Sequence, residues 1–257
     1  MPPFQPPKLG VGMIFSPALR LWLERRFEAA TPFLDVLEIE PQTLWFADDA
    51  LTGPFHEFAA GIELFQALPG AKLVHSVSLP LGGTRAPDPA QCALIRETAA
   101  RLNSPWVSEH LSVGGTPHQA SGFFLPPLQT DEGVAIAARN IRAFAAAVGR
   151  PVAVETGVAY LARKAFEMPD GDYVAQVVRA ADCGILLDLH NVYCNARNGR
   201  LDFDDFLARL PKDRVWEMHL AGGMEQDGVW LDAHSGPIPP DLKAMAREVL
   251  SELPNLG

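Results

Sequence analysis

The sequence predicts an α/β fold of the TIM-barrel type, (β/α)₈, in a single domain over residues 1–257. Short apolar runs alternate with segments of helix length, which is the order of elements that builds a parallel sheet. The runs are rich in Val, Leu and Ile and lack strict alternation, as strands buried on both faces do. A length of 257 residues suits one barrel better than two ordinary domains.

The predicted strands are the apolar runs at residues 9–15, 36–39, 72–79, 106–113, 152–155, 185–189 and 215–220. A closed barrel of this type needs one strand more than these runs supply. The chain stops at residues 254–257, where an eighth strand would begin. We therefore expect the eighth strand to be missing from this chain. The barrel is then open, or another segment fills the gap, or the sequence is shorter than the natural protein.

The helix-like segments lie at residues 17–29, 89–102, 131–148, 172–181, 202–210 and 240–253. Asp88 is placed to cap the second of them, with Pro89 at the favoured first position. Gly149 is a typical stop for the third, and Asp204 or Asp205 suits the first turn of the fifth. The Pro- and Gly-rich stretches at residues 81–87 and 116–129 are expected to be loops on one face of the barrel.

Charge and cysteine content exclude several classes of protein. The formal net charge is −10, which counts against a nucleic-acid-binding surface. The three cysteines include no CxxC pair, so neither a disulfide framework nor a thiolate zinc site is expected. The N-terminus lacks a signal-peptide pattern, and no apolar run approaches the roughly 20 residues of a membrane span. We expect a cytoplasmic protein that binds neither nucleic acid nor membrane.

Polar residues with metal-binding side chains recur at the ends of the predicted strands. In chain order they are His75, Glu109 and His110, Glu155, Asp188 with His190 and Asn191, His219, and Asp232 with His234. In a TIM-type barrel the C-terminal ends of the strands converge on one face, and that face holds the active site. The sequence therefore predicts that these side chains meet in one pocket.

The number of these groups favours a site for two or three metal ions, because a mononuclear catalytic zinc uses about three protein ligands. Nitrogen and oxygen ligands without thiolate suit iron, manganese or zinc. A single strand-end histidine is more often a hydrogen-bonded structural residue, so the joint pattern carries the prediction. Neighbours on one strand point to opposite faces, which favours His110 over Glu109 as the inward residue. Either His190 or Asn191 is expected to support a ligand rather than to bind metal.

The roles of several other polar residues are left open by the sequence. Glu38 and Glu40 could reach the mouth of the barrel, and a structural ion pair is an equal alternative. His56 and His118 lie away from the strand ends and are expected at the surface or in a substrate loop. Cys194 is expected to be a packing residue, as a buried free thiol usually is.

Several segments together resemble a known family. The pieces are residues 74–79, 108–111, 155–160, 186–193, 219–222 and 232–234. They are similar to those of the multinuclear non-haem iron-dependent oxidases (MNIO), whose best-known member helps to build the copper-chelating peptide methanobactin. The resemblance covers about residues 9–257 and places the chain in the xylose-isomerase-like TIM barrel superfamily. The chain departs from the family in carrying Thr156 where relatives commonly have Asn, and in its first two strands.

The resemblance implies a set of site residues. Trimetal sites in the superfamily carry an Asp-x-x-His motif and an Asp-x-His motif. By position these motifs fall on Asp188/Asn191 and on Asp232/His234. The first correspondence favours Asn191 over His190 as the ligand. The implied metal ligands are His75, His110, Glu155, Asp188, Asn191, His219, Asp232 and His234. Glu155 and Asp232 are the expected catalytic residues, and Glu109 and His190 remain uncertain. Relatives carry a further acidic residue on the eighth strand, so one ligand is expected to be absent here.

The resemblance also implies a reaction. Members of the family use two or three iron ions, as Fe(II) and Fe(III), and O₂ to oxidise a residue, often cysteine, of a ribosomally made precursor peptide. A small partner protein usually presents the leader of that peptide. Three rival functions remain: a divalent-metal sugar isomerase or epimerase with Glu155 as base, a metal-dependent phosphodiesterase, and a degenerate, non-catalytic barrel that acts as a binding protein. The charge of −10 counts against the phosphodiesterase.

Overall fold

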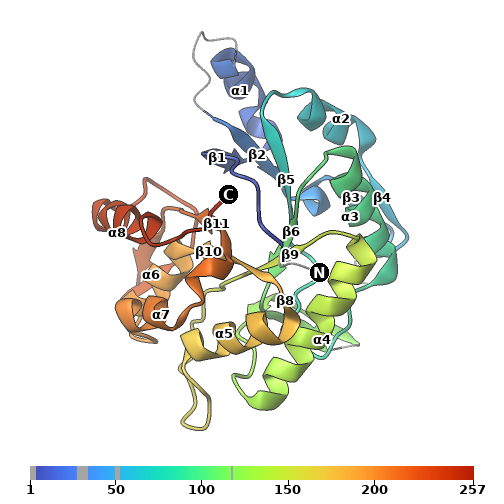
Figure 1. Ribbon diagram of the computed structural model, residues 1–257. Coiled ribbons are helices and arrows are strands. Elements are labelled where there is room, and N and C mark those ends of the chain that lie inside the picture. The colour runs from blue at the N-terminus through green and yellow to red at the C-terminus, as the bar shows by residue number, and fades with distance from the viewer. Residues whose placement is uncertain (1–3, 28–33, 50–52, 117) are drawn as a thin grey trace.

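The computed structural model describes residues 4–27, 34–49, 53–116 and 118–257. Its centre is a sheet of seven parallel strands in the order β1-β2-β5-β6-β9-β10-β11 (Figure 1). These strands are β1 (Gly12–Ile14), β2 (Val36–Ile39), β5 (Ala71–Ser76), β6 (Val107–His110), β9 (Val152–Glu155), β10 (Gly184–Asp188) and β11 (Val215–His219). Each predicted apolar run overlaps one of them, so the predicted α/β fold with a parallel sheet is confirmed.

Helices lie around the outside of this sheet (Figure 1). They are α1 (Arg20–Phe27), α2 (Ala59–Ala67), α3 (Pro89–Arg101), α4 (Asp131–Val148), α5 (Asp170–Ala181), α6 (Leu189–Arg197), α7 (Phe203–Arg209) and α8 (Pro240–Leu250), with short 3₁₀ turns at Pro17–Leu19, Pro41–Leu44 and Lys212–Arg214. Residues 28–29 of the first predicted helix lie outside the described residues. The α2 and α6 helices were not predicted; α6 begins directly where β10 ends, without a loop to separate the two patterns.

The predicted helix ends are confirmed where a side chain or a glycine defines them. The carboxylate of Asp88 accepts a hydrogen bond from the backbone N–H of Gln91 at the start of α3. Gly149 ends α4 in the left-handed conformation with φ 65°, which glycine adopts without a steric penalty. Both Asp204 and Asp205 lie in the first turn of α7, where their charge complements the helix dipole.

Three antiparallel hairpins, each following the end of a barrel strand, add to the C-terminal face of the barrel. They are β3 (Trp45–Ala47) with β4 (Phe55–Glu57), β7 (Val113–Thr116) with β8 (Gln119–Leu125), and β12 (Met224–Gln226) with β13 (Val229–Leu231). The prediction that residues 116–129 form a loop is therefore wrong for residues 119–125. The β8 strand is largely exposed, so it carries none of the apolar alternation by which half-buried strands are recognised.

Two layers of side chains fill the inside of the barrel. The lower layer is an apolar cluster of Val36, Leu73, Trp106, Ala153, Leu186 and Trp216. Because side chains alternate along a strand, the residues two positions further on point the same way. For five of the six positions these residues are polar and buried: Glu38, His75, Ser108, Glu155 and Asp188. The sixth is Met218, because the register of β11 shifts against β10. The barrel thus changes from an apolar floor to a layer of imidazoles and carboxylates within one step of two residues.

The last residues occupy the gap between β11 and β1, and the C-terminus lies beside β1 (Figure 1). The backbone N–H of Gly257 donates to the carbonyl of Trp216, while its own carbonyl accepts from the N–H groups of Leu9 and Gly10. No eighth strand is present in the described part of the chain, as expected. A single residue makes backbone bonds to both flanking segments in its place.

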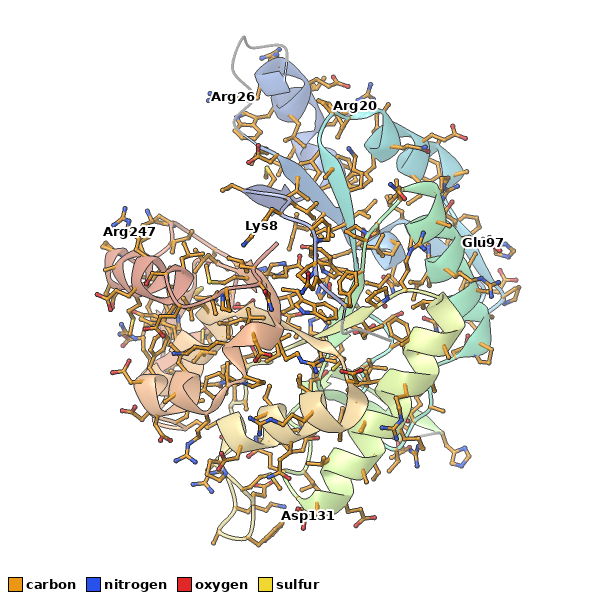
Figure 2. The ribbon with its side chains drawn as sticks, viewed as in Figure 1. Lys8, Arg20, Arg26, Glu97, Asp131 and Arg247 are labelled. Carbon is orange, nitrogen blue, oxygen red and sulfur yellow. The ribbon has the colours of Figure 1, made fainter. Side chains whose placement is uncertain are left out.

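Charged side chains project from the outer helices. The labelled side chains Arg20, Glu97, Asp131 and Arg247 extend from the outer helices and are exposed (Figure 2). Within the described residues, no helix combines the length and the apolar character that crossing a bilayer requires.

Candidate metal centre

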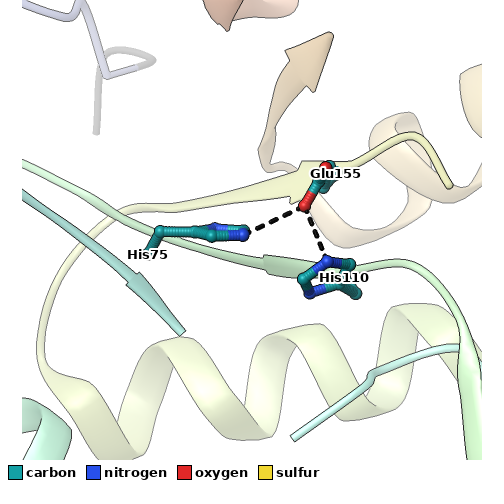
Figure 3. Close-up of side chains that lie close together, drawn as sticks. All are labelled: His75, His110 and Glu155. Carbon is teal, nitrogen blue, oxygen red and sulfur yellow. Dashed lines mark ion pairs between the residues drawn. The ribbon is translucent and has the colours of Figure 1, made fainter. Parts of the chain in front are cut away.

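Glu155, at the end of β9, lies between two imidazoles from neighbouring strands (Figure 3). Its Oε2 atom is 3.1 Å from Nε2 of His75 and 3.0 Å from Nε2 of His110. Neither contact has the geometry of a hydrogen bond, and Oε2 is buried without a hydrogen-bond partner. A carboxylate oxygen and two ring nitrogens that face one another in this way match the ligand set of a metal ion.

The other ring nitrogen of each imidazole is held by a neighbouring side chain. Nδ1 of His75 lies 2.9 Å from the hydroxyl oxygen of Ser108, and Nδ1 of His110 lies 3.2 Å from Oε1 of Glu109. Such outer contacts determine the orientation of an imidazole ligand and its tautomer. Both rings are therefore held with Nε2 toward Glu155.

Glu109 itself points away from the cavity. Its Oε2 accepts hydrogen bonds from the hydroxyl of Ser76, at 2.6 Å, and from the backbone N–H of Leu79, at 2.9 Å. His110 and not Glu109 lines the cavity, which is the orientation that the sequence favoured. Glu109 instead anchors the loop after β5 and the ring of His110.

Asp188 and His219 extend the group on the other side of Glu155. Ligand atoms of Glu155, Asp188 and His219 lie within 4.8 Å of one another, as do those of Glu155, His75 and His110. Glu155 is common to both groups, so its carboxylate is placed to bridge two ions. Asn191 lies next to Asp188 across the first turn of α6, and its buried Oδ1 has no hydrogen-bond partner.

A third group of potential ligands was only partly predicted. It consists of Glu38, Glu217 and His219, whose ligand atoms also lie within 4.8 Å of one another. Nε2 of His219 is 2.8 Å from Oε2 of Glu38 and 3.6 Å from Oε1 of Glu217. The sequence analysis considered Glu38 but missed Glu217. The spacing of Glu217 two residues before His219 on one strand was the signal that could have found it.

Asp232 and His234 lie at the rim of the same cavity, on the segment after β13. Oδ1 of Asp232 is 3.0 Å from Nδ1 of His190 and 3.1 Å from Nε2 of His234. His234 is exposed, and neither residue belongs to the close ligand groups found among the described residues. They line the cavity together with the five strand-end residues His75, His110, Glu155, Asp188 and His219.

His190 is buried behind Asp232 and does not line the cavity. The indole N–H of Trp230 donates to its Nε2 at 3.3 Å, and an indole N–H can only donate. Nε2 is therefore the acceptor, and the Nδ1–H group of His190 donates a hydrogen bond to Oδ1 of Asp232. Asn191 lines the cavity instead.

Burial and mutual charge strongly perturb the titratable groups. Burial opposes protonation of His110, but the carboxylates of Glu155 and Glu109 outweigh it and raise the pKa to about 10. Burial would raise the pKa of Glu155, yet His110 and His75 hold it well below its usual value. Burial, together with the charge of Glu155, raises the pKa of Asp188 to about 6. Dense perturbation of this kind is typical of functional sites.

The strand ends enclose a cavity of about 330 Å³ whose walls combine these polar groups with apolar side chains such as Val77, Phe124 and Val158. The ring of Phe124 lies 4.2 Å from the ring of His110, measured between centroids. The cavity has the size of a small-molecule or side-chain site. It can hold cations and one reacting group away from bulk water.

Comparison with known proteins shows where the chain belongs. A UPF0276 protein of Anaeromyxobacter sp. (strain Fw109-5) is 35% identical over 65% of this chain and 59% of its own length. A UPF0276 protein of Chromobacterium violaceum is 34% identical over 70% of this chain and 65% of its own length. The chain thus spans less than two thirds of these relatives.

One solved structure shares the fold of this chain, and one family model matches most of its sequence. The xylose isomerase domain protein from Planctomyces limnophilus superposes with a TM-score of 0.53 at 14% identity, covering 99% of this chain and 87% of that one. The two chains therefore share the TIM-barrel fold. The model of the RiPP precursor modification enzymes MbnB/TglH/ChrH matches residues 20–257. RiPPs are ribosomally made, post-translationally modified peptides, and this chain belongs to the MbnB/TglH/ChrH family of enzymes that modify their precursors.

Proposed function

We propose that the protein is an O₂-dependent iron oxidase with two or three iron ions, and that it modifies a cysteine of a ribosomal precursor peptide. Membership of a precursor-modifying family supports the peptide substrate. The observation that carries the metal is the pair of ligand groups that share Glu155. A small partner protein that presents the leader completes the proposal.

The residues present fit such a cluster. Three buried oxygens in or beside the candidate ligand set lack a hydrogen-bond partner: Oε2 of Glu155, Oδ1 of Asn191 and Oε1 of Glu38. A buried polar atom without a partner costs about 1–3 kcal/mol, and bound cations would remove that cost. The ligand set of nitrogen and oxygen atoms suits non-haem iron.

The proposed ligands are His75, His110, Glu155, Asp188, Asn191, His219, Asp232 and His234. Iron held there would supply O₂ binding and one-electron oxidation. The chain itself orients the ligands, through Ser108 and Glu109 on two imidazoles and His190 on Asp232. Hydrogen bonds from His190 and His234 outweigh burial and lower the pKa of Asp232 to about 2, so a carboxylate faces the rim where substrate enters.

Elemental analysis and Mössbauer spectroscopy of anaerobically purified protein test this proposal, together with O₂ uptake in the presence of a cysteine-containing peptide. We expect two or three iron ions per chain and O₂ consumption that depends on the peptide. Protein that binds only manganese or zinc and consumes no O₂ would point to a non-oxidative enzyme and would refute the proposal.

Metal binding should strengthen as the pH rises from 6 to 8. The carboxylates around His75, His110 and His219 outweigh their burial and raise all three pKa values, so each imidazole must lose a proton to bind a metal. The apparent Fe(II) affinity should rise about tenfold per pH unit for each displaced proton. Anaerobic titration against a chelator measures this.

The stability of the metal-free protein should fall as the pH rises. The raised pKa of His110 contributes stability that is complete below the unfolded value near 6.5 and is lost as the pH rises toward 10.

For the metal-binding prediction, an Fe(II) affinity that stays flat between pH 6 and 8 would mean that the imidazoles of His75, His110 and His219 do not bind the metal.

Replacing His190 by phenylalanine should lower iron affinity about 10- to 100-fold while the fold is retained. The ring bulk remains, but Asp232 loses the hydrogen bond that holds its carboxylate toward the cavity. Cys194→Ala is the matched control, because Sγ of Cys194 lies at hydrogen-bond distance, 3.6 Å, from Nε2 of His190 but makes no such contact with Asp232. Equal losses in both variants would indicate a packing role for His190.

A further inference from the structure

A second hollow of about 540 Å³ lies beside the cavity, between the β3–β4 and β7–β8 hairpins. We call it the aromatic groove, after Trp45, Phe46, Phe55, Phe123 and Phe124 in its walls. Val77 and Phe124 line both the groove and the cavity. The groove therefore adjoins the candidate metal centre, and the ring of Phe124, which lines both, lies 4.2 Å from the ring of His110 between centroids.

Aromatic rings in the groove are exposed to solvent. Phe123 is 67% exposed and Phe46 is 61% exposed, and Phe124 beside them is 39% exposed. Exposed apolar side chains that gather in one hollow mark a binding surface rather than ordinary surface residues. Aromatic walls of this kind suit the apolar side chains of a peptide, and a few polar groups beside them can hold its backbone.

Two polar atoms on one turn of the groove wall lack hydrogen-bond partners. They are the amide oxygen of Gln42 and the indole N–H of Trp45, and both atoms are buried. The amide nitrogen of Gln42 donates to the hydroxyl of Ser76 at 2.7 Å, which determines which way its oxygen points. One free acceptor and one free donor match the N–H and C=O of a peptide group.

The hairpins also suit an extended chain. Each is a two-stranded sheet of its own within the described residues, so its outer edge carries backbone groups that no further strand pairs. Extended peptides bind such edges by main-chain hydrogen bonds, while pockets between them select alternate side chains. Residues of both hairpins line the groove.

We propose that the aromatic groove binds, in extended form, the part of the substrate peptide next to the reacting residue, and that it selects an aromatic side chain there. This inference rests on the proposed peptide-modifying function. The indole N–H of Trp45 and the amide oxygen of Gln42 hold the peptide backbone. The exposed ring of Phe123 contacts the neighbouring side chain.

Capped, fluorescein-labelled peptides test the proposal by fluorescence polarisation. The probes are Gly-Phe-Cys-Gly-Gly and Gly-Gly-Cys-Phe-Gly, each with a matched peptide that has Ala in place of Phe. The better Phe peptide should bind the intact protein about tenfold more tightly than its Ala partner. Phe123→Ala should abolish this preference. Phe166→Ala is the matched control, since Phe166 is 66% exposed and lines neither the groove nor the cavity.

A second variant separates backbone from side-chain recognition. Trp45→Phe keeps an aromatic ring but removes the N–H, so it should weaken the Phe and Ala peptides equally, by about fivefold. Equal affinities of the Phe and Ala peptides for the parent protein, or no binding by either below about 1 mM, would overturn the proposal. A Phe123→Ala change that spares peptide binding but disrupts self-association would assign the groove to a second copy of the chain.

The same peptides test the proposed binding in the groove separately from the proposed oxidation. A Phe preference in protein that neither consumes O₂ nor changes the peptide mass would leave the groove assignment standing and refute the oxidation. Oxidation of Phe and Ala peptides at equal rates and affinities would refute the groove and leave the oxidation standing.

Discussion

Glu155→Gln should remove most of the bound iron and lower peptide oxidation by at least a hundredfold. Glu155 is the one residue shared by the group with His75 and His110 and the group with Asp188 and His219. A neutral amide cannot bridge two cations as a carboxylate does, and its N–H₂ group would face the imidazoles. Metal content per chain and the rate of peptide mass change measure the effect.

The control for this variant is Glu57→Gln. Glu57 is a carboxylate on β4 that pairs with Arg101 at 2.6 Å and does not line the cavity. The Glu57→Gln protein should retain full iron content and activity. Circular dichroism should show that both variants are folded. A Glu155→Gln protein with parental iron content would contradict the assignment of Glu155 as the bridging ligand.

Trp106→Ala should lower the free energy of unfolding by about 3–5 kcal/mol. Trp106 is fully buried in the apolar floor beneath the candidate site, and its removal leaves a cavity beside Trp216. Its indole N–H also donates to Oε2 of Glu217 at 2.9 Å, so a buried carboxylate loses its donor. For a protein of this size the loss corresponds to a fall in melting temperature of about 10 °C.

Thermal and urea unfolding of the metal-free protein check this value without interference from metal binding. Trp22→Ala is the control, because Trp22 lies on α1 at 42% exposure and surface substitutions usually change stability by less than about 0.5 kcal/mol. Trp106→Phe should be intermediate, because the ring volume is partly kept but the N–H is lost. Equal stability of the Trp106→Ala protein and its parent would mean that the barrel floor does not support the layer above it.

Local patterning was enough to predict most of the framework. The strand at residues 152–155 and the helix at residues 131–148 have the predicted boundaries, since each is an uninterrupted pattern with a clear start and stop. The gathering of His75, Glu155, Asp188 and His219 follows from the fold class alone. Parallel strands bring their C-terminal ends to one face whatever their separation in the chain.

Other features were decided by contacts between distant segments. Glu217 joins the inner layer through an irregularity in register, where Ile185 pairs with Val215 and Leu186 with Glu217. The buried position of His190 depends on Trp230 and Asp232, about 40 residues later in the chain. The β8 strand forms because β7 pairs with it, and not because its own residues alternate. Periodicity reports which face of an element is buried, whereas hydrogen-bond partners and register become definite only when the elements pack together.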